Sequence, residues 1–162
     1  MGMTDSGNNS SPPDGFWPLD RSAFGIRRRM HYPSTRETIN DAVALILDVA
    51  RQCGCDADQE ADLEIALREA LANAVIHGND EDQEKNVFVR CYGGHAMTLV
   101  LVRDEGPGFE PAEIPDPRNN DRLQLDHGRG LFLMKALMDE VQFNDRGNSV
   151  TLVLRFEGEA TA

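Results

Sequence analysis

The sequence contains few cysteines, and those present do not form a recognisable set. Three cysteines cannot pair completely, which favours reduced thiols in a cytoplasm over a disulfide framework. Cys53 and Cys55 could grip a soft metal ion, but no second Cys/His pair lies nearby in the sequence to complete four ligands. We therefore favour free thiols over a metal site.

Long hydrophobic runs and a secretory signal are also missing. The longest apolar runs, such as residues 97–102, are far too short to span a bilayer. The N-terminus has no basic region followed by an apolar run, which is the pattern of a signal peptide. From these two absences we expect a cytoplasmic protein.

Basic residues are scarce relative to acidic ones. The chain has 16 Lys and Arg against 28 Asp and Glu, a formal net charge of −12, and its sequence pI is about 4.6. Such a surface repels phosphate backbones and anionic lipid, so we predict neither nucleic acid nor membrane as a partner. A protein partner with a basic or mixed surface suits this charge better.

The 162 residues fit one domain that is long enough to bury a core. Residues 1–22 are rich in Ser, Asn, Gly, Pro and Asp, a composition that predicts a disordered N-terminal tail. We expect one folded domain over residues 23–157 and a frayed C-terminus over residues 158–162.

Two helices are predicted in the first half of the chain. Ser34 and Glu37 form a capping-box pattern before an apolar repeat with helical spacing, and Gly54 ends that helix. A second apolar stripe predicts a helix over about residues 58–77, with Gly78 as its stop.

Five short apolar or alternating segments predict strands. They span residues 26–32, 87–92, 97–102, 141–143 and 150–156. One hairpin is expected through Gly93-Gly94 and another across residues 144–147. Because hairpins cannot connect parallel neighbours, we predict an α/β (α+β) two-layer sandwich, a mixed or antiparallel sheet covered by helices on one face.

Three groups of residues could carry chemistry. Glu69 and Asn73 stand four apart on the second predicted helix and so share one face, where a carboxylate can accept a proton and an amide oxygen can coordinate a hard cation. Taken alone, such a pair is more often a solvated helix edge. Asp104 follows an apolar strand and precedes Gly106 and Gly108, so it could face a ligand, although an ordinary surface turn has the same composition.

The third group is Gly128-Arg129-Gly130, which follows a polar loop over residues 106–127. A third helix is predicted to start near Arg129. Glycines ahead of a helix N-terminus free N–H groups to point at an anion, and the helix dipole favours negative charge there. A flexible loop end is the alternative for this group.

The order of these motifs resembles the GHKL ATPase superfamily, whose members share the Bergerat ATP-binding fold. The stretch from Glu69 to Gly78, Glu-Ala-Leu-Ala-Asn-Ala-Val-Ile-His-Gly, is most similar to the anti-sigma-factor serine/threonine kinase branch. The resemblance covers about residues 24–156. It implies a cytoplasmic, homodimeric kinase that uses ATP and Mg²⁺, phosphorylates a small antagonist (anti-anti-sigma) protein and binds a sigma factor.

The resemblance also implies roles for single residues. Asn73 would hold the Mg²⁺ of Mg·ATP, and Glu69 would be the general base. Asp104 would accept a hydrogen bond from the adenine amino group, with Gly106 in the turn after it and Gly108 letting the purine lie close. Gly128 and Gly130 would hold phosphates through their N–H groups, and the side chain of Arg129 could add positive charge there.

One position departs from the family pattern. Gly147-Asn148 stands where the family often has Gly-Thr, whose threonine supports the adenine contact through a water molecule. An asparagine can still bind a water, so we keep Asn148 among the nucleotide-binding residues. The competing functional hypothesis is an ATP-gated protein-binding module in a partner-switching pathway without kinase activity; the presence of Glu69 argues against it.

Overall fold

The computed structural model describes Ser22, residues 24–108 and residues 126–156. Apart from Ser22, the predicted N-terminal tail lies outside these residues, and so does the predicted frayed end. Five strands form one sheet in the order β1-β2-β3-β5-β4, with every neighbouring pair antiparallel. The strands are β1 (Ile26–Pro33), β2 (Asn86–Gly94), β3 (Met97–Arg103), β4 (Glu140–Phe143) and β5 (Ser149–Arg155).

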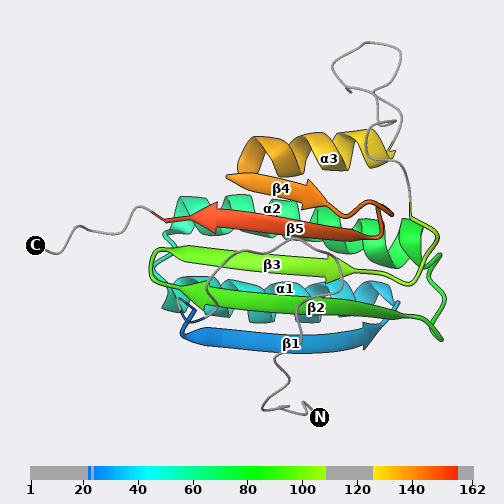
Figure 1. Cartoon of the computed structure of the whole chain (residues 1–162), viewed down its shortest axis with the longest axis horizontal. Coiled ribbons are helices and arrows are strands. Elements are labelled where there is room, and N and C mark those ends of the chain that lie inside the picture. Colours follow the sequence, from blue (N-terminus) through cyan, green and yellow to red (C-terminus); the bar gives the residue numbers. More distant parts are fainter. Residues whose placement is uncertain (1–21, 23, 109–125, 157–162) are drawn as a thin grey trace, which may run out of the picture.

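The helices form the second layer. They are α1 (Arg36–Gln52), α2 (Ala57–Ala72), the π-helical turn η2 (Asn73–Gly78) and α3 (Asp126–Leu137). Figure 1 shows α1 and α2 lying along the same face of the sheet, with α3 beside the β4 end. The predicted two-layer sandwich is therefore confirmed, and the sheet is antiparallel throughout.

Apolar side chains from both layers meet in one core. α1 contributes buried residues at helical spacing, and β2 contributes alternate residues from the face that the helices cover. The principal contributors are Ala42, Val43, Ile46, Leu47, Leu63, Leu67, Leu71, Val87, Val89, Val100 and Leu152. Each large aliphatic side chain buried in this way stabilises the fold by about 1.5–3 kcal/mol.

The start of α1 differs from the prediction. Its N-cap residue is Thr35, whose side chain accepts no capping hydrogen bond, so the predicted capping box of Ser34 and Glu37 is wrong. Ser34 is buried, and its hydroxyl donates instead to the carbonyl of Lys85 at 3.1 Å. The Ser34 hydroxyl, which the local pattern assigned to the cap of α1, therefore makes a tertiary contact instead.

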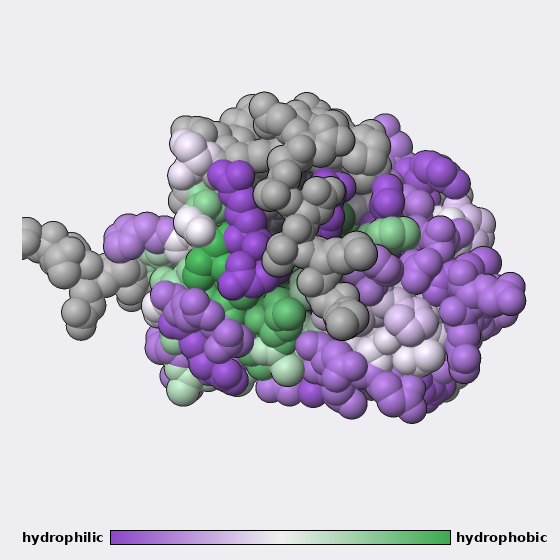
Figure 2. Space-filling model, turned by 90° about the horizontal axis from the view of Figure 1, so that it is seen from below, coloured by the Kyte–Doolittle hydropathy of each residue, from purple (hydrophilic) through white to green (hydrophobic). Residues whose placement is uncertain are grey.

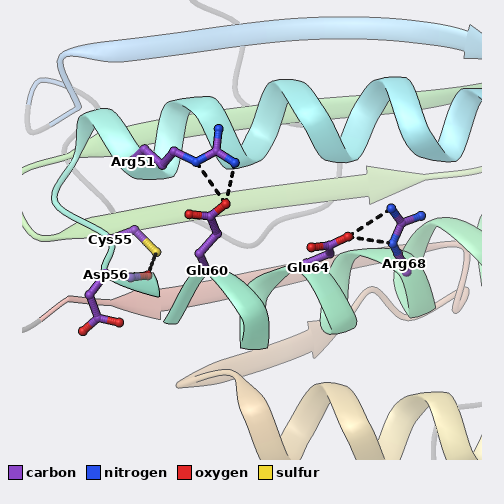
Figure 3. A network of polar contacts seen from close by, with 6 residues as sticks. All are labelled: Arg51, Cys55, Asp56, Glu60, Glu64 and Arg68. Carbon is purple, nitrogen blue, oxygen red and sulfur yellow. Dashed lines mark hydrogen bonds and ion pairs between the residues drawn. The ribbon is translucent and has the colours of Figure 1, made fainter. Parts of the chain in front are cut away.

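A capping box does exist at α2. The Gln59 N–H donates to Asp56 Oδ1 at 2.8 Å, and the Asp56 N–H donates to Gln59 Oε1 at 3.2 Å. Figure 3 shows two ion pairs on these helices: Arg51 with Glu60 between α1 and α2, and Arg68 with Glu64 along α2. Exposed pairs of this kind contribute about 0–1 kcal/mol each.

The hairpin between β2 and β3 is present, but its turn is not Gly93-Gly94. Both glycines lie inside β2, and the turn is His95-Ala96, with Ala96 at φ 60°. A Cβ on Gly93 would lie 2.6 Å from Cys53 Sγ and 2.8 Å from Val49 Cγ1. Gly93 is thus explained by the close packing of α1 on the sheet.

The cysteines take structural positions. Cys91 is buried, Cys53 and Cys55 are half-buried, and all three are free thiols. The Cys55 thiol donates to the carbonyl of Asp56, as Figure 3 shows. Within residues 24–108 and 126–156, no group of three or more His, Cys, Asp or Glu is placed to hold a metal ion.

β1 is one of the two edge strands of the sheet. Among the described strands it pairs with β2 alone, and it presents Arg27, Arg28 and Arg29 as exposed residues. Charged residues on an edge strand oppose unwanted pairing with other chains. Figure 2, seen from the β1 side, shows a mainly hydrophilic surface whose largest hydrophobic area lies left of the centre. No helix among the described residues is long and apolar enough to cross a membrane.

Candidate active site

A cavity of about 240 Å³ opens between the end of the second helix, the end of β3 and the β4–β5 hairpin. Four of the predicted site residues line it: Asn73, Asp104, Gly108 and Asn148. The apolar part of its wall includes Ala74, Val102, Phe143 and Val150. Pockets for whole ligands usually have about 300–1,000 Å³, so this cavity suits one flat ring system, with the rest of a larger ligand extending outside.

Asp104 is the most deeply placed charged residue of the cavity. It follows β3 directly and is only 9% exposed, and its Oδ1 accepts a hydrogen bond from the Gly106 N–H at 2.8 Å. Burial raises the pKa of Asp104 to about 6, while the Gly106 N–H and the charge of Lys85 act in the opposite direction. Oδ2 makes no hydrogen bond to any residue described in the structure, so it can accept one from a ligand.

Two glycines make room for the Asp104 carboxylate. A Cβ on Gly78 would lie 2.4 Å from the Asp104 carboxyl carbon, and a Cβ on Gly106 would lie 2.0 Å from the Gly78 carbonyl oxygen. Gly106 therefore acts by close packing and by its N–H, and it is not among the cavity-lining residues. Gly78 lines the cavity, although its sequence position indicated only a helix stop.

Gly108 has a second reason to be glycine. Its φ is +78°, in the left-handed region that favours glycine, and a Cβ would lie 1.8 Å from the carbonyl oxygen of Arg146. The chain after β3 thus passes directly against the β4–β5 turn.

Asn148 ties that turn to Asp104. Its Nδ2 donates to the Asp104 carbonyl oxygen at 3.3 Å, and the Asp104 N–H donates to the Asn148 carbonyl oxygen at 2.9 Å. Its Oδ1 accepts from Asn144 Nδ2 at 2.6 Å. The side chain that replaces the expected threonine therefore positions the Asp104 backbone while lining the cavity.

Asn73 lies where the second helix, which carries Glu69, changes its geometry. The helix changes from α to π geometry at Asn73, and the Asn79 N–H donates to the Ala74 carbonyl five residues back at 2.9 Å. Single π turns within helices occur frequently at functional sites. The predicted helix over residues 58–77 is therefore present, but its last turn is wider than an α-helix.

Glu69 lies beside the start of α3 and outside the cavity lining. A Cβ on Gly130 would lie 2.7 Å from Glu69 Oε2 and 3.7 Å from Asn73 Nδ2. Gly130 thus allows α3 to pack directly on the helix edge that carries the carboxylate and the amide. Both side chains are half-exposed, so a substrate can reach them.

The third helix starts earlier in the sequence than predicted. The helix begins at Asp126, before the predicted start near Arg129, so Gly128 and Gly130 lie inside it. In an α-helix only the first four N–H groups lack an intrahelical acceptor. The Gly128 N–H is within that first turn and can meet an anion, whereas Gly130 lies beyond it. Arg129 is exposed.

The site combines three features: a ring-sized cavity with Asp104 as a buried hydrogen-bond acceptor, the Asn73 amide in its lining, and the Glu69 carboxylate one helical turn from Asn73. Gly130 of α3 lies next to that carboxylate, one turn after the helix N-terminus, which favours negative charge. This combination can bind a base through Asp104, a metal-associated phosphate chain near Asn73 and α3, and a hydroxyl near Glu69. The predicted glycines explain part of the packing, but Gly78, Asn79 and Asn144 had no sequence signal beyond ordinary helix-end and turn residues.

Comparison with known proteins agrees with this arrangement. The family model described as a histidine kinase-like ATPase domain matches residues 32–154. The serine-protein kinase RsbW of Bacillus subtilis is 31% identical over 137 residues, which cover 80% of this chain and 86% of that protein. The anti-sigma F factor of Geobacillus thermodenitrificans is 28% identical over 132 residues, which cover 79% of this chain and 90% of that protein.

A solved structure shows the same fold. The crystal structure of the RsbU and RsbW domains of a Mycobacterium tuberculosis protein aligns with a TM-score of 0.55 at 20% identity, over 81% of this chain. The match spans 32% of that longer chain. Together with the family match over most of the sequence, these findings show that the chain belongs to the histidine kinase-like ATPase domain family, whose members similar to it include RsbW serine-protein kinases and anti-sigma F factors.

Proposed function

We propose that the protein is an ATP-dependent serine/threonine protein kinase that acts as an anti-sigma factor and phosphorylates a small antagonist protein. The observation that carries the proposal is the shared cavity of Asn73 and Asp104, with Glu69 one helical turn away. The names and the high mutual coverage of the similar proteins support the same activity.

Asp104 is proposed to recognise the adenine base. Its Oδ2, which has no hydrogen-bond partner among the described residues, would accept a hydrogen bond from the exocyclic amino group, while Val102 and Val150 line the apolar part of the cavity. The ionised carboxylate is the form that accepts, and a pKa of about 6 leaves it mostly ionised at neutral pH. Guanine has a carbonyl oxygen at the equivalent position, which the carboxylate would repel.

The triphosphate is proposed to leave the cavity at Asn73 and reach the start of α3. A half-exposed amide oxygen is a suitable ligand for Mg²⁺, which usually takes few protein ligands and keeps phosphate and water oxygens. When bound, Mg²⁺ would supply positive charge to the phosphates. The N–H groups at the start of α3, including that of Gly128, and the exposed side chain of Arg129 are placed to add to it.

Glu69 is proposed as the general base. Its carboxylate would accept the proton of the attacking serine or threonine hydroxyl as the oxygen forms a bond to the γ-phosphorus. The bond between the γ-phosphorus and the bridging oxygen breaks, and ADP leaves with the electron pair. Half-exposed Glu69 is open to a protein substrate and lies against Gly130, one turn into α3 from the start where the phosphates would lie.

The partner assignments extend this proposal. A sigma factor, an antagonist protein and a second copy of the chain are proposed as partners within the cytoplasm. The anti-sigma name of a similar protein supports the sigma factor, and the acidic charge of the chain suits a partner with a basic or mixed surface.

The test is phosphate transfer from γ-labelled Mg·ATP to candidate antagonist proteins. Glu69→Ala should retain ATP binding and lose roughly 10²–10⁴-fold in transfer rate, the usual contribution of a general base. Glu64→Ala is the matched control, because Glu64 lies on the same helix and pairs with Arg68 on the surface. Undiminished transfer by Glu69→Ala would refute its role, and ATP binding without any transfer by the wild type would favour an ATP-gated binding module.

A further inference from the structure

Asn79 is a buried polar residue outside the cavity lining. It follows η2, its side chain is 0% exposed, and it stands next to Gly78, which packs on the Asp104 carboxylate. Its side chain has two N–H donors and one carbonyl oxygen, and all three groups are in use.

The three hydrogen bonds reach three different segments. Nδ2 donates to Ser34 Oγ at 2.6 Å and to the Asn86 carbonyl oxygen at 2.9 Å. Oδ1 accepts from the Glu105 N–H at 2.8 Å. One amide therefore joins the segment before α1, the start of β2 and the residue that follows Asp104.

We propose that Asn79 is a positioning residue that sets the Asp104 carboxylate in the base-binding cavity and thereby controls the preference for adenine. This inference rests on the proposed function, because it concerns recognition of the nucleotide base. Asn79 itself does not contact the nucleotide in this proposal.

The bond to Glu105 is the link that matters for Asp104. Asp104 follows β3 directly, and its carboxylate has one hydrogen bond from a described residue, that of the Gly106 N–H. The Glu105 N–H is fixed by Asn79, and Glu105 Oε2 in turn accepts from the Asn86 N–H at 2.6 Å. The peptide unit between Asp104 and Glu105 is thus held by Asn79, and the Glu105 side chain is held by Asn86, so the backbone that carries the Asp104 carboxylate is fixed next to the cavity.

The backbone around Asn79 indicates a tightly defined position. The next two residues, Asp80 and Glu81, both have positive φ, 55° and 54°, which non-glycine residues adopt uncommonly. The Glu81 N–H donates to the Val75 carbonyl oxygen at 2.8 Å, which closes the chain back on η2. The chain therefore reverses sharply at Asn79, and the same turn holds Gly78 against Asp104.

A purely structural role predicts a different result from a positioning role. Loss of stability alone leaves the folded fraction with its normal choice between ATP and GTP. Loss of the Glu105 bond lets the carboxylate turn away from the base, so ATP binding weakens while GTP binding changes little. The ATP-to-GTP affinity ratio separates the two roles.

The experiment compares Asn79→Ala with Ser34→Ala. Ser34→Ala removes one Asn79 bond on the side away from Asp104 and leaves the Glu105 bond intact. Calorimetric titration of Mg·ATP and Mg·GTP, below the melting temperature of each variant, should show about tenfold weaker ATP binding for Asn79→Ala, the value of one hydrogen bond to a charged group. Ser34→Ala should keep both the affinity and the ratio within about twofold.

If Asn79→Ala does not fold, Asn79→Asp takes its place. Burial holds this aspartate in its neutral form, whose carbonyl oxygen can still accept from the Glu105 N–H while one of the two donors is lost, so the ATP preference should survive a lower melting temperature. Loss of the preference in Asn79→Asp, or an unchanged ratio in a folded Asn79→Ala, would overturn the positioning role. Failure of the wild type to bind Mg·ATP would instead overturn the proposed function, so the two failures can be told apart.

Discussion

Gly130→Ala should lower phosphate transfer without harming the fold. Gly130 lies in α3, where alanine is favoured over glycine by about 0.5–1 kcal/mol because it loses less backbone entropy. The added Cβ would lie 2.7 Å from Glu69 Oε2, the far end of a flexible side chain that can move away. Stability should therefore change little or rise, while the carboxylate is displaced.

The size of the effect follows from the distance. To reach an ordinary contact of 3.4 Å, the Glu69 oxygen must retreat by about 0.7 Å. A misplacement of about 1 Å at a reacting group can cost about 10²-fold in rate, so we expect transfer to fall by about 10- to 100-fold. ATP affinity should stay within about twofold, because Glu69 does not line the base cavity.

The assay is single-turnover transfer from labelled Mg·ATP at saturating antagonist, together with a thermal melt of each variant. Gly25→Ala is the control, since a Cβ there meets nothing within 4 Å and its φ is not positive. A Gly130→Ala variant that melts normally and transfers phosphate at the wild-type rate would refute the placement of Glu69 at the reacting hydroxyl.

Two further changes probe the Asp104 pocket. Gly78→Ala puts a Cβ 2.4 Å from the Asp104 carboxyl carbon, so ATP affinity should fall at least tenfold, checked by calorimetry; unchanged affinity would contradict the close packing. Because burial raises the pKa of Asp104 to about 6, the charged form costs stability at pH 7, and Asp104→Asn should be more stable there by up to about 3 kcal/mol. That advantage should shrink as the pH falls from about 6 towards 4, where the folded wild type holds its proton, and urea melts at pH 7 and pH 4.5 measure the change. ATP affinity of the wild type should weaken over the same fall in pH, and a flat profile would contradict the role of the ionised carboxylate.

The sequence allowed the layers and the order of the site residues to be predicted, because both depend on local patterns. Alternation along Ile26–Tyr32 and the apolar repeat of the second helix were sufficient to predict a strand and a helix. The helix spacing of Glu69 and Asn73 likewise fixes their common face.

The errors have a common physical origin in contacts between distant segments. Ser34 forms hydrogen bonds with Lys85 and Asn79 instead of capping α1. Gly93 is required by the packing of α1 on the sheet and does not form the hairpin turn. The fit of Gly78 against Asp104 depends on tertiary distances of the same kind. Such contacts have no periodicity in the sequence, so they emerge only from the three-dimensional arrangement.

The central claim is that the cavity around Asp104 binds the base of ATP. The most direct measurement is calorimetric titration of Mg·ATP into the wild type and into Asp104→Ala, with thermal melts confirming that both are folded. We predict saturable binding by the wild type and at least tenfold weaker binding by Asp104→Ala, since the only carboxylate among the described residues that line the cavity is lost. Equal affinity of the two proteins for ATP would contradict the account.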